Sequence, residues 1–371
     1  MATTGKQLFT TLEADGTLTV AIEEVSFPVP TGNQVLVKME ASPINPSDLV
    51  ILAGAADLEN AEYSPGKYVA NMPEPFNSGY KARHGLKLPV GNEGAGTVVA
   101  AGDSDMAKAL MGQRVACVAG GQAFSQYCIV DSTMCLPLGD HSCEDGASAF
   151  VNPMTALGFV ENAKMDGQKA IVHTAAASNL GQMLIRICQE DDIELVNIVR
   201  KAEHVEMLKG IGAKYVVNSS DSDFMAQLCN AIDATDAFYG FDPIGGGQAT
   251  DNVFRAMEQV AVSKMTEYSR YGSNQAKRMF IYGWLDFSPT ILTPGYGFGW
   301  TLSGWLLTPF LQKVGMEAMM RMRQRVLDNL TTTFASSYKR RVNLEEMLTK
   351  EAVIDYRARK TGAKYLVTPW G

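Results

Sequence analysis

Two kinds of hydrophobic pattern follow one another along the chain. In the first third, residues 17–22 and 34–39 alternate apolar and polar positions with a period of two, and residues 94–99 and 114–118 do so less regularly. This period is typical of β-strands that bury one face. We therefore predict that the first part of the chain is rich in strands.

From about Val151 the pattern changes to short apolar runs that alternate with amphipathic segments. Residues 169–174 and 194–199 form apolar runs, and residues 180–188 between them have helical spacing. Strands that alternate with helices in this way form a parallel sheet with helices on both faces. The sequence thus predicts an α/β protein, and its 371 residues favour two domains.

Between these two patterns, residues 53–88 show no sustained period. The segment contains three prolines, four glycines and three tyrosines, so we expect one long loop. Such a loop in a compact domain is usually functional, as a lid or a substrate wall. A poorly ordered surface insertion is the alternative interpretation.

Composition and charge exclude several classes of protein. There are 32 Lys and Arg residues against 40 Asp and Glu, a net charge of −8, whereas a nucleic-acid binder needs a basic face. The six cysteines form no C-x-x-C pair, which argues against a disulfide framework and a four-thiolate zinc site. We therefore expect no nucleic-acid partner and a cytoplasmic location.

One uncharged stretch, residues 287–312, requires a check for a membrane span. It contains three prolines and four glycines, which would break a spanning helix repeatedly. We expect a buried segment or a face that meets another subunit, and no membrane association. The N-terminus lacks the apolar region of a signal peptide.

A turn of small residues follows the apolar run 169–174. In the register of a G-x-G-x-x-G fingerprint, the three glycine positions hold Ala176, Ser178 and Gly181. Small residues let the backbone approach a pyrophosphate at a helix N-terminus, although such a turn can also serve packing alone. We predict a dinucleotide site here, formed by Ala176, Ser178, Asn179, Leu180 and Gly181.

The end of the next apolar run indicates which dinucleotide is bound. Folds that select NAD place an acidic residue there to bind the ribose 2′-hydroxyl. This sequence has Arg200 and Lys201 instead, and an arginine can hold a 2′-phosphate with two hydrogen bonds. We therefore predict NADPH as the cofactor. The alternative is that both are solvated residues at the start of a helix.

Several short motifs follow one another along the chain. They are Ile44-Asn-Pro-Ser-Asp48, Gly91-Asn-Glu-Gly-Ala-Gly96, Val151-Asn-Pro-Met-Thr-Ala156, the turn Ala175–Gly181, Gly212-Ala213 and Phe241-Asp-Pro-Ile-Gly-Gly246. Their order resembles that of the medium-chain dehydrogenase/reductase superfamily. The similarity runs over nearly the whole chain and points to the zinc-independent branch, with its NADPH:quinone oxidoreductases and mitochondrial-type 2-enoyl thioester reductases.

This resemblance implies a fold and a domain organisation. A GroES-like β-barrel catalytic domain is expected over residues 1–150 and is completed by residues 308–371. A Rossmann domain, with a doubly wound parallel sheet that binds NADPH, is expected over residues 151–307. By the same resemblance, the Rossmann domains pair into a homodimer, with residues 287–312 along the edge where they meet.

The resemblance also implies site residues. Asn45 and Thr155 would lie near the nicotinamide, although packing remains an alternative for Thr155. Zinc-dependent members carry Cys at the position of Asn45 and His at that of Asn92, and amides are poor zinc ligands, so we predict no metal. Further cofactor contacts are expected from Asp242, Ile244, Tyr282, Gly283, Trp284, Leu285 and Trp305.

Without a metal, the reduction of a conjugated acceptor is easier than that of an isolated ketone. We predict an NADPH-dependent reductase of a small quinone or α,β-unsaturated carbonyl. The alternatives are a trans-2-enoyl thioester reductase and a non-catalytic NADPH-binding protein with a regulatory or structural role. Related thioester reductases carry a tyrosine about eight residues after the Asn-Pro-Ser-Asp motif, where this chain has none. Tyr63, Tyr68 and Tyr80 lie further along the segment 53–88 and could each reach the site, and we take Tyr63 as the candidate proton donor.

One further residue, His173, lies at the end of the apolar run 169–174. A histidine at the end of a buried strand is more often a hydrogen-bonded core residue than a catalytic base. We predict the former.

Overall fold

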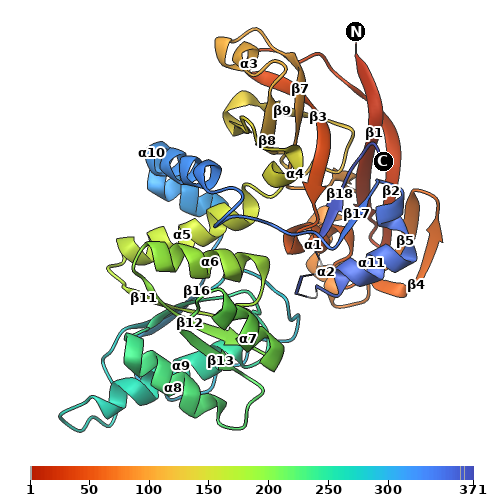
Figure 1. Cartoon of the computed structure of the whole chain (residues 1–371). Helices are drawn as coiled ribbons and strands as arrows, with labels where there is room; N and C mark the ends of the chain where they lie inside the picture. Colours follow the sequence, from red (N-terminus) through yellow and green to blue (C-terminus); the bar gives the residue numbers. More distant parts are fainter. Residues whose placement is uncertain (1, 360, 363) are drawn as a thin grey trace. The chain divides into compact units, whose positions relative to one another are not determined.

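The chain divides into two compact units in the structure, a computed structural model that describes residues 2–359, 361–362 and 364–371 (Figure 1). Unit 1 comprises Met1–Val151 and Arg323–Gly371, and unit 2 comprises Asn152–Met322. No helix within the described ranges combines the length and the apolar character that a membrane crossing requires.

Two sheets form unit 1. One has the strand order β4-β5-β2-β1-β6, and the other has the order β10-β8-β7-β3-β18-β17, with β9 also paired to β3. The strands are β1 (Thr3–Leu12), β2 (Thr17–Phe27), β3 (Gln34–Pro43), β4 (Asp57–Ser64), β5 (Lys67–Asn71), β6 (Leu88–Pro89), β7 (Glu93–Ala101), β8 (Arg114–Val118), β9 (Tyr127–Asp131), β10 (Cys135–Pro137), β17 (Arg340–Val342) and β18 (Tyr365–Val367).

Short helices connect these strands. They are α1 (Pro46–Leu52), α2 (Phe76–Gly79), α3 (Asp105–Ala109), α4 (Cys143–Gly146) and α11 (Lys350–Arg357). The four segments for which alternation predicted strands lie in β2, β3, β7 and β8, so this prediction is confirmed.

The prediction of one long loop over residues 53–88 is wrong. The segment forms a hairpin of β4 and β5, and β5 pairs with β2. The alternation is hard to see because β4 exposes most of its side chains, whereas Tyr68 and Ala70 of β5 are buried in the hydrophobic core of unit 1.

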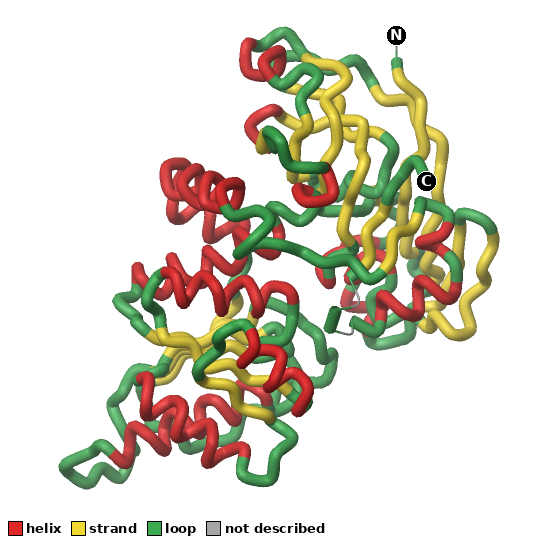
Figure 2. The backbone as a smooth tube through the Cα atoms, in the orientation of Figure 1, coloured by secondary structure: helices red, strands yellow, loops and turns green. Residues whose placement is uncertain are grey.

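Unit 2 is built on six parallel strands in the order β13-β12-β11-β14-β15-β16, which confirms the predicted doubly wound parallel sheet. Figure 2 shows its helices on both sides of the strands. The strands are β11 (Ala170–His173), β12 (Glu194–Val199), β13 (Tyr215–Asn218), β14 (Tyr239–Asp242), β15 (Lys277–Ile281) and β16 (Trp300–Gly304). The helices are α5 (Val151–Met165), α6 (Asn179–Glu190), α7 (Ala202–Gly210), α8 (Phe224–Thr235), α9 (Ala249–Ser263) and α10 (Leu307–Asp328).

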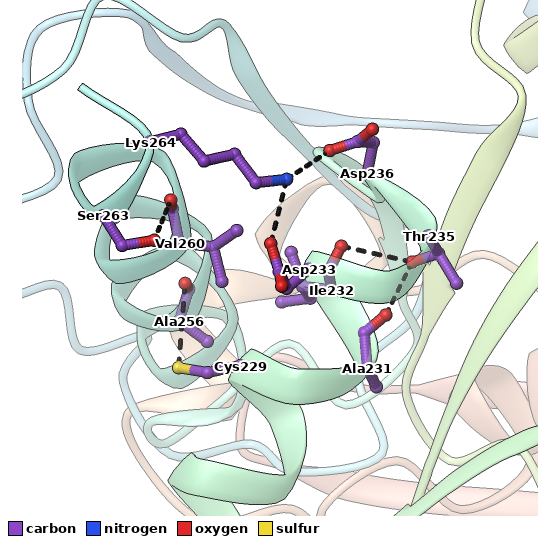
Figure 3. A network of polar contacts seen from close by, with 10 residues as sticks. All are labelled: Cys229, Ala231, Ile232, Asp233, Thr235, Asp236, Ala256, Val260, Ser263 and Lys264. Carbon is purple, nitrogen blue, oxygen red and sulfur yellow. Dashed lines mark hydrogen bonds and ion pairs between the residues drawn. The ribbon is translucent and has the colours of Figure 1, made fainter. Parts of the chain in front are cut away.

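Helices α8 and α9 pack against each other on the sheet of unit 2, where α8 contacts β12 and β13 and α9 contacts β15. Lys264, which caps α9, reaches Asp233 and Asp236 at the end of α8, with Nζ–O distances of 3.0 and 2.6 Å (Figure 3). Asp236 ends α8 in the left-handed region, at φ +53°. All three side chains are substantially exposed, so the ion pairs add little stability and mainly fix how α8 ends.

Helix α10 determines where the chain leaves unit 2. The sequence places this boundary between residues 307 and 308, whereas the structure divides the chain after Met322. The first turns of α10 stay with unit 2 because the Phe310 ring packs 5.3 Å from that of Trp305. Arg323 belongs to unit 1 because it donates to the carbonyls of Thr133 and Cys135.

Candidate functional site

The turn between β11 and α6 has the close packing that the small residues predict. Ser178 caps α6, because its hydroxyl accepts a hydrogen bond from the Gly181 amide at 3.1 Å. A Cβ atom at Gly181 would lie 2.1 Å from the Ala176 carbonyl oxygen, so only glycine fits. Asn179 is the first residue of α6, and the side chain of Leu180 is buried. The turn thus brings the N-terminus of α6 to the carboxyl edge of the sheet.

Asp242, at the end of β14, organises the neighbouring loop. Its carboxylate accepts hydrogen bonds from the hydroxyls of Thr174 and Thr250 and from the amides of Ile244 and Gly245. Four donors satisfy most of its acceptor sites. Asp242 therefore fixes the ends of β11 and β14 against one another, where the strand order of the sheet reverses and such folds bind ligands.

Arg200 follows β12 at the same edge of the sheet. Its side chain is exposed, and within the described residues its guanidinium has no ion-pair partner. Its carbonyl oxygen accepts a hydrogen bond from the Ser220 hydroxyl at 2.8 Å, from the loop after β13. Lys201 is also exposed, but it forms an ion pair with Glu203 at 3.1 Å. Arg200 is the better placed of the two cations to bind an anionic ligand.

An aromatic cluster lies under the carboxyl ends of β11 and β15. Tyr282 hydrogen-bonds to Nε2 of the fully buried His173 at 2.8 Å, and the Phe159 ring from α5 contacts Tyr282 and Trp305 edge-on at 4.7 Å each. His173 is thus a hydrogen-bonded core residue, as predicted. Trp305 is 9 % exposed, and its indole nitrogen lacks a partner within the described part of the chain.

The turn after Tyr282 is more open than this cluster. Gly283 is partly buried, and Trp284 and Leu285 are 67 % and 36 % exposed. Gly245 and Trp284 lie in contact, since a Cβ atom on Gly245 would come within 2.5 Å of the indole. The predicted cofactor residues of unit 2 therefore gather at one edge of its sheet, some in its core and some at its surface.

In unit 1, the buried carboxylate of Glu93 holds Asn45. One oxygen of Glu93 accepts from the Asn45 side-chain amide at 2.8 Å, and the other accepts from the amides of Phe150 and Val151 at 2.9 and 2.8 Å. Asn45 is 1 % exposed, and its side-chain oxygen has no partner in the described ranges. An unpaired buried acceptor is costly, so this oxygen suits a ligand that donates a hydrogen bond.

Asp48 and Asn92 complete this arrangement. The Asp48 carboxylate accepts from the backbone amides of Asn45 and Asn92 at 2.8 and 3.0 Å, and the Asn92 side chain donates to Ser47. Both asparagines at the positions of zinc ligands are therefore engaged as amide donors. Across the residues that the structure describes, no three His, Cys, Asp or Glu side chains gather as a potential metal site.

A lysine that the sequence analysis did not single out balances these carboxylates. Lys364 donates to the Ser148 hydroxyl at 2.8 Å, and Ser148 hydrogen-bonds to the Tyr338 hydroxyl at 2.9 Å. Burial lowers the pKa of Lys364 to about 8, against the opposing effect of the nearby Glu93 and Asp48 charges. The residues of this network come from segments far apart in the sequence. The feature that could have indicated the network from the sequence is Glu93, an acidic residue at the start of a strand of mostly small and apolar residues.

The two other predicted catalytic residues lie in different settings. Thr155 is buried within α5 and not at its start, so it does not cap the helix. Tyr63, the candidate proton donor, is partly buried and donates to the Leu58 carbonyl at 2.9 Å. Burial raises the pKa of its phenol. The local hydrogen bond and the raised pKa give Tyr63 no feature of an activated proton donor.

The buried Asp48 predicts a pH-dependent stability. Burial, chiefly, raises its pKa from 3.8 to about 7. Because the folded protein binds the Asp48 proton more tightly than the unfolded chain does, protonation of Asp48 stabilises the fold at low pH. This stabilisation is lost as the pH rises from the unfolded-state pKa toward 7, and the free energy of unfolding falls by up to about 4 kcal/mol. We expect the melting temperature of the wild type to fall more steeply between pH 5 and 7.5 than that of Asp48→Asn. Equal slopes in thermal unfolding would contradict this expectation; Lys364, whose pKa burial lowers to about 8, titrates mainly above this range.

Comparison with known proteins agrees with the architecture. Residues 31–140 match the alcohol dehydrogenase GroES-like domain. The whole chain superposes on a crystal structure from Mesorhizobium loti that carries the name NADPH:quinone reductase, with a TM-score of 0.74, 25 % identity and coverage of 99 % of this chain and 98 % of that one. Like that structure, the chain joins a GroES-like domain to a domain with a parallel sheet, which is the architecture of two-domain dehydrogenases and reductases.

Two curated relatives, both named as reductases, are similar to part of the chain. Bovine prostaglandin reductase-3 is 27 % identical over 197 residues, which are 52 % of this chain and 44 % of that protein. The mitochondrial enoyl-[acyl-carrier-protein] reductase of Arabidopsis thaliana is 25 % identical over 288 residues, 74 % of this chain and 66 % of that protein. The matches thus span about half to two thirds of these relatives. The chain is thus similar to zinc-independent reductases of the medium-chain dehydrogenase/reductase superfamily, and residues 31–140 match its GroES-like domain.

Proposed function

We propose that the protein is an NADPH-dependent, zinc-independent reductase that transfers hydride to a quinone or an α,β-unsaturated carbonyl acceptor. The observation that carries this proposal is the edge of the parallel sheet in unit 2, where the turn at Gly181 and the cation Arg200 lie at the ends of neighbouring strands. The names of the relatives, which are quinone, prostaglandin and enoyl reductases, support the reaction class.

The residues at this edge fit a phosphorylated dinucleotide. The turn at Ser178 and Gly181 would receive the pyrophosphate at the start of α6. Arg200 would bind the 2′-phosphate, with Lys201 as a second positive charge. Ile244 and the turn from Tyr282 to Leu285 would contact the nicotinamide half, and Asp242 would act by holding this loop in place.

When bound, reduced nicotinamide supplies the hydride. The residues of the chain then orient the acceptor, exclude water and stabilise the charge that develops on the acceptor oxygen. Asn45 and Thr155 are the proposed neighbours of the nicotinamide. The Asn45 side-chain oxygen is buried without a partner among the described residues, and Thr155 is a buried polar residue of α5. Quinones and small enones can take the proton from water.

A trans-2-enoyl thioester reductase is the second candidate, favoured by the similarity to the enoyl reductase of Arabidopsis. Against it stands the hydrogen bond that engages Tyr63 with Leu58. The two candidate functions are distinguished by measuring NADPH consumption with 1,4-naphthoquinone, 3-nonen-2-one and a crotonyl thioester. We expect the first two to be reduced with higher kcat/KM, and a clear preference for the thioester would reverse the assignment.

A non-catalytic NADPH-binding protein is a third candidate. Saturable NADPH binding without turnover of any of the three acceptors would support it.

In every case the cofactor site can be tested by Gly181→Ala, which should abolish NADPH binding because the added methyl group meets the Ala176 carbonyl. Gly210→Ala is the matched control, since no atom lies within 4 Å of its Cβ position.

The protein also has a candidate surface for self-association. Strand β16 pairs with β15 alone among the described strands and ends the sheet of unit 2. Phe298, Trp300 and Leu306, along and beside it, are 80 %, 39 % and 64 % exposed. We include in the proposal a homodimer formed through this edge and a cytoplasmic location, which suits the six free cysteines.

A further inference from the structure

His173 and Tyr282 form a hydrogen-bonded pair, of which the proposed cofactor site uses only Tyr282. His173 is fully buried at the end of β11, and Tyr282 follows the end of β15. Their rings stack with centroids 6.0 Å apart and an angle of 15° between the planes, and His173 Nε2 lies 2.8 Å from the Tyr282 hydroxyl. Burial lowers the pKa of His173 to about 3, so the imidazole is neutral at physiological pH.

The pair has unused hydrogen-bonding capacity. His173 Nδ1 is buried without a partner in the described parts of the chain, and the one hydrogen bond found for the Tyr282 hydroxyl is that to His173. If Nε2 carries the imidazole proton, the phenol keeps its own hydrogen for another acceptor. If the phenol donates to Nε2, its oxygen remains free to accept.

The pair also lies where the proposed cofactor would bind. Thr174, the residue after His173, donates to Asp242, and the Tyr282 amide donates to the Asp242 carbonyl at 3.0 Å. Both residues are thus tied to the carboxyl edge of the sheet. Phe159 packs against both rings and against Trp305, which leaves the phenol little freedom to turn.

We propose that His173 is a positioning residue that fixes the Tyr282 hydroxyl for a hydrogen bond to the carboxamide of the nicotinamide. This inference rests on the proposed function. A primary carboxamide offers both a carbonyl oxygen and an amino group, so it can complement the phenol in either direction of the His173–Tyr282 hydrogen bond. The role of His173 is exerted through Tyr282 and requires no proton transfer.

A double-mutant cycle tests the inference by binding alone. Tyr282→Phe removes the hydroxyl and keeps the ring, and His173→Phe removes the imidazole and keeps a flat side chain. We expect each variant to raise the NADPH Kd by about 5- to 10-fold, as measured by nucleotide fluorescence, which corresponds to one hydrogen bond. The double variant should bind NADPH no more weakly than the single variant with the higher Kd, because both substitutions remove the same interaction.

Two controls separate positioning from general damage to the fold. Adenosine 2′,5′-bisphosphate lacks the nicotinamide, so its Kd should be unchanged in all three variants. Tyr239→Phe removes another buried phenol of the same sheet, one that donates to Asp166 at 2.7 Å, and should leave the NADPH Kd unchanged.

Three outcomes would overturn the inference: additive losses, unchanged NADPH affinity, or an equal loss for the bisphosphate. A wild-type protein that binds neither nucleotide would instead overturn the proposed function. The two failures are therefore distinguishable in the same set of measurements.

Discussion

Replacing Glu93 by leucine is expected to lower the free energy of unfolding by about 3–5 kcal/mol and to abolish turnover. The carboxylate is fully buried and accepts from three donors: the Asn45 side chain and the amides of Phe150 and Val151. Leucine has a similar size but no acceptor, so all three donors would be left unpaired. Activity should be lost as well, because Asn45 loses the partner that orients its amide.

Urea unfolding measures the loss of stability, and steady-state kinetics at saturating NADPH measures the loss of activity. Glu93→Gln keeps one acceptor oxygen and should have a smaller effect on both. Glu345→Leu is the matched control, because this carboxylate is 42 % exposed and pairs with Lys6 at the surface. A stable and active Glu93→Leu variant would show that the network around Asn45 has no role in the site.

The fold could be predicted from the sequence where the hydrophobic pattern is strong. The parallel sheet of unit 2 was predicted correctly because β11 and β12 are largely apolar, buried runs and α6 between them buries residues at helical spacing. Residues 53–88 were misinterpreted because β4 lies at the edge of its sheet and has few buried positions. The weaker the burial of an element, the less its period shows in the sequence.

Some residues of the candidate site could likewise be predicted from the sequence, and others could not. The turn at Gly181 and the cation Arg200 follow directly from local sequence, since each stands at a fixed distance from a strand. Glu93 and Lys364 can be recognised as site residues only in the folded chain, because the groups near them are far apart in the sequence. For Asp242 the sequence indicated the right place but not the role, because four internal donors occupy its carboxylate.

Replacing Arg200 by alanine should raise the KM for NADPH by about 10- to 100-fold and change the KM for NADH by less than about twofold. The guanidinium is exposed and has no ion-pair partner among the described residues, so its loss breaks no ion pair in that part of the chain. A bidentate hydrogen bond to a 2′-phosphate would therefore be the main interaction removed. Because NADH lacks this phosphate, the ratio of the two KM values isolates it.

The neighbouring lysine provides the internal comparison. Lys201→Ala should have a smaller effect, because the ion pair with Glu203 already occupies its ammonium and both groups are exposed. Arg321→Ala removes an arginine of similar exposure from α10, where its partner is Glu317, and should leave both KM values unchanged. If Arg200→Ala affected NADPH and NADH equally, the charge after β12 would contribute to binding without recognising the 2′-phosphate, and the preference for NADPH would have to originate elsewhere in the site.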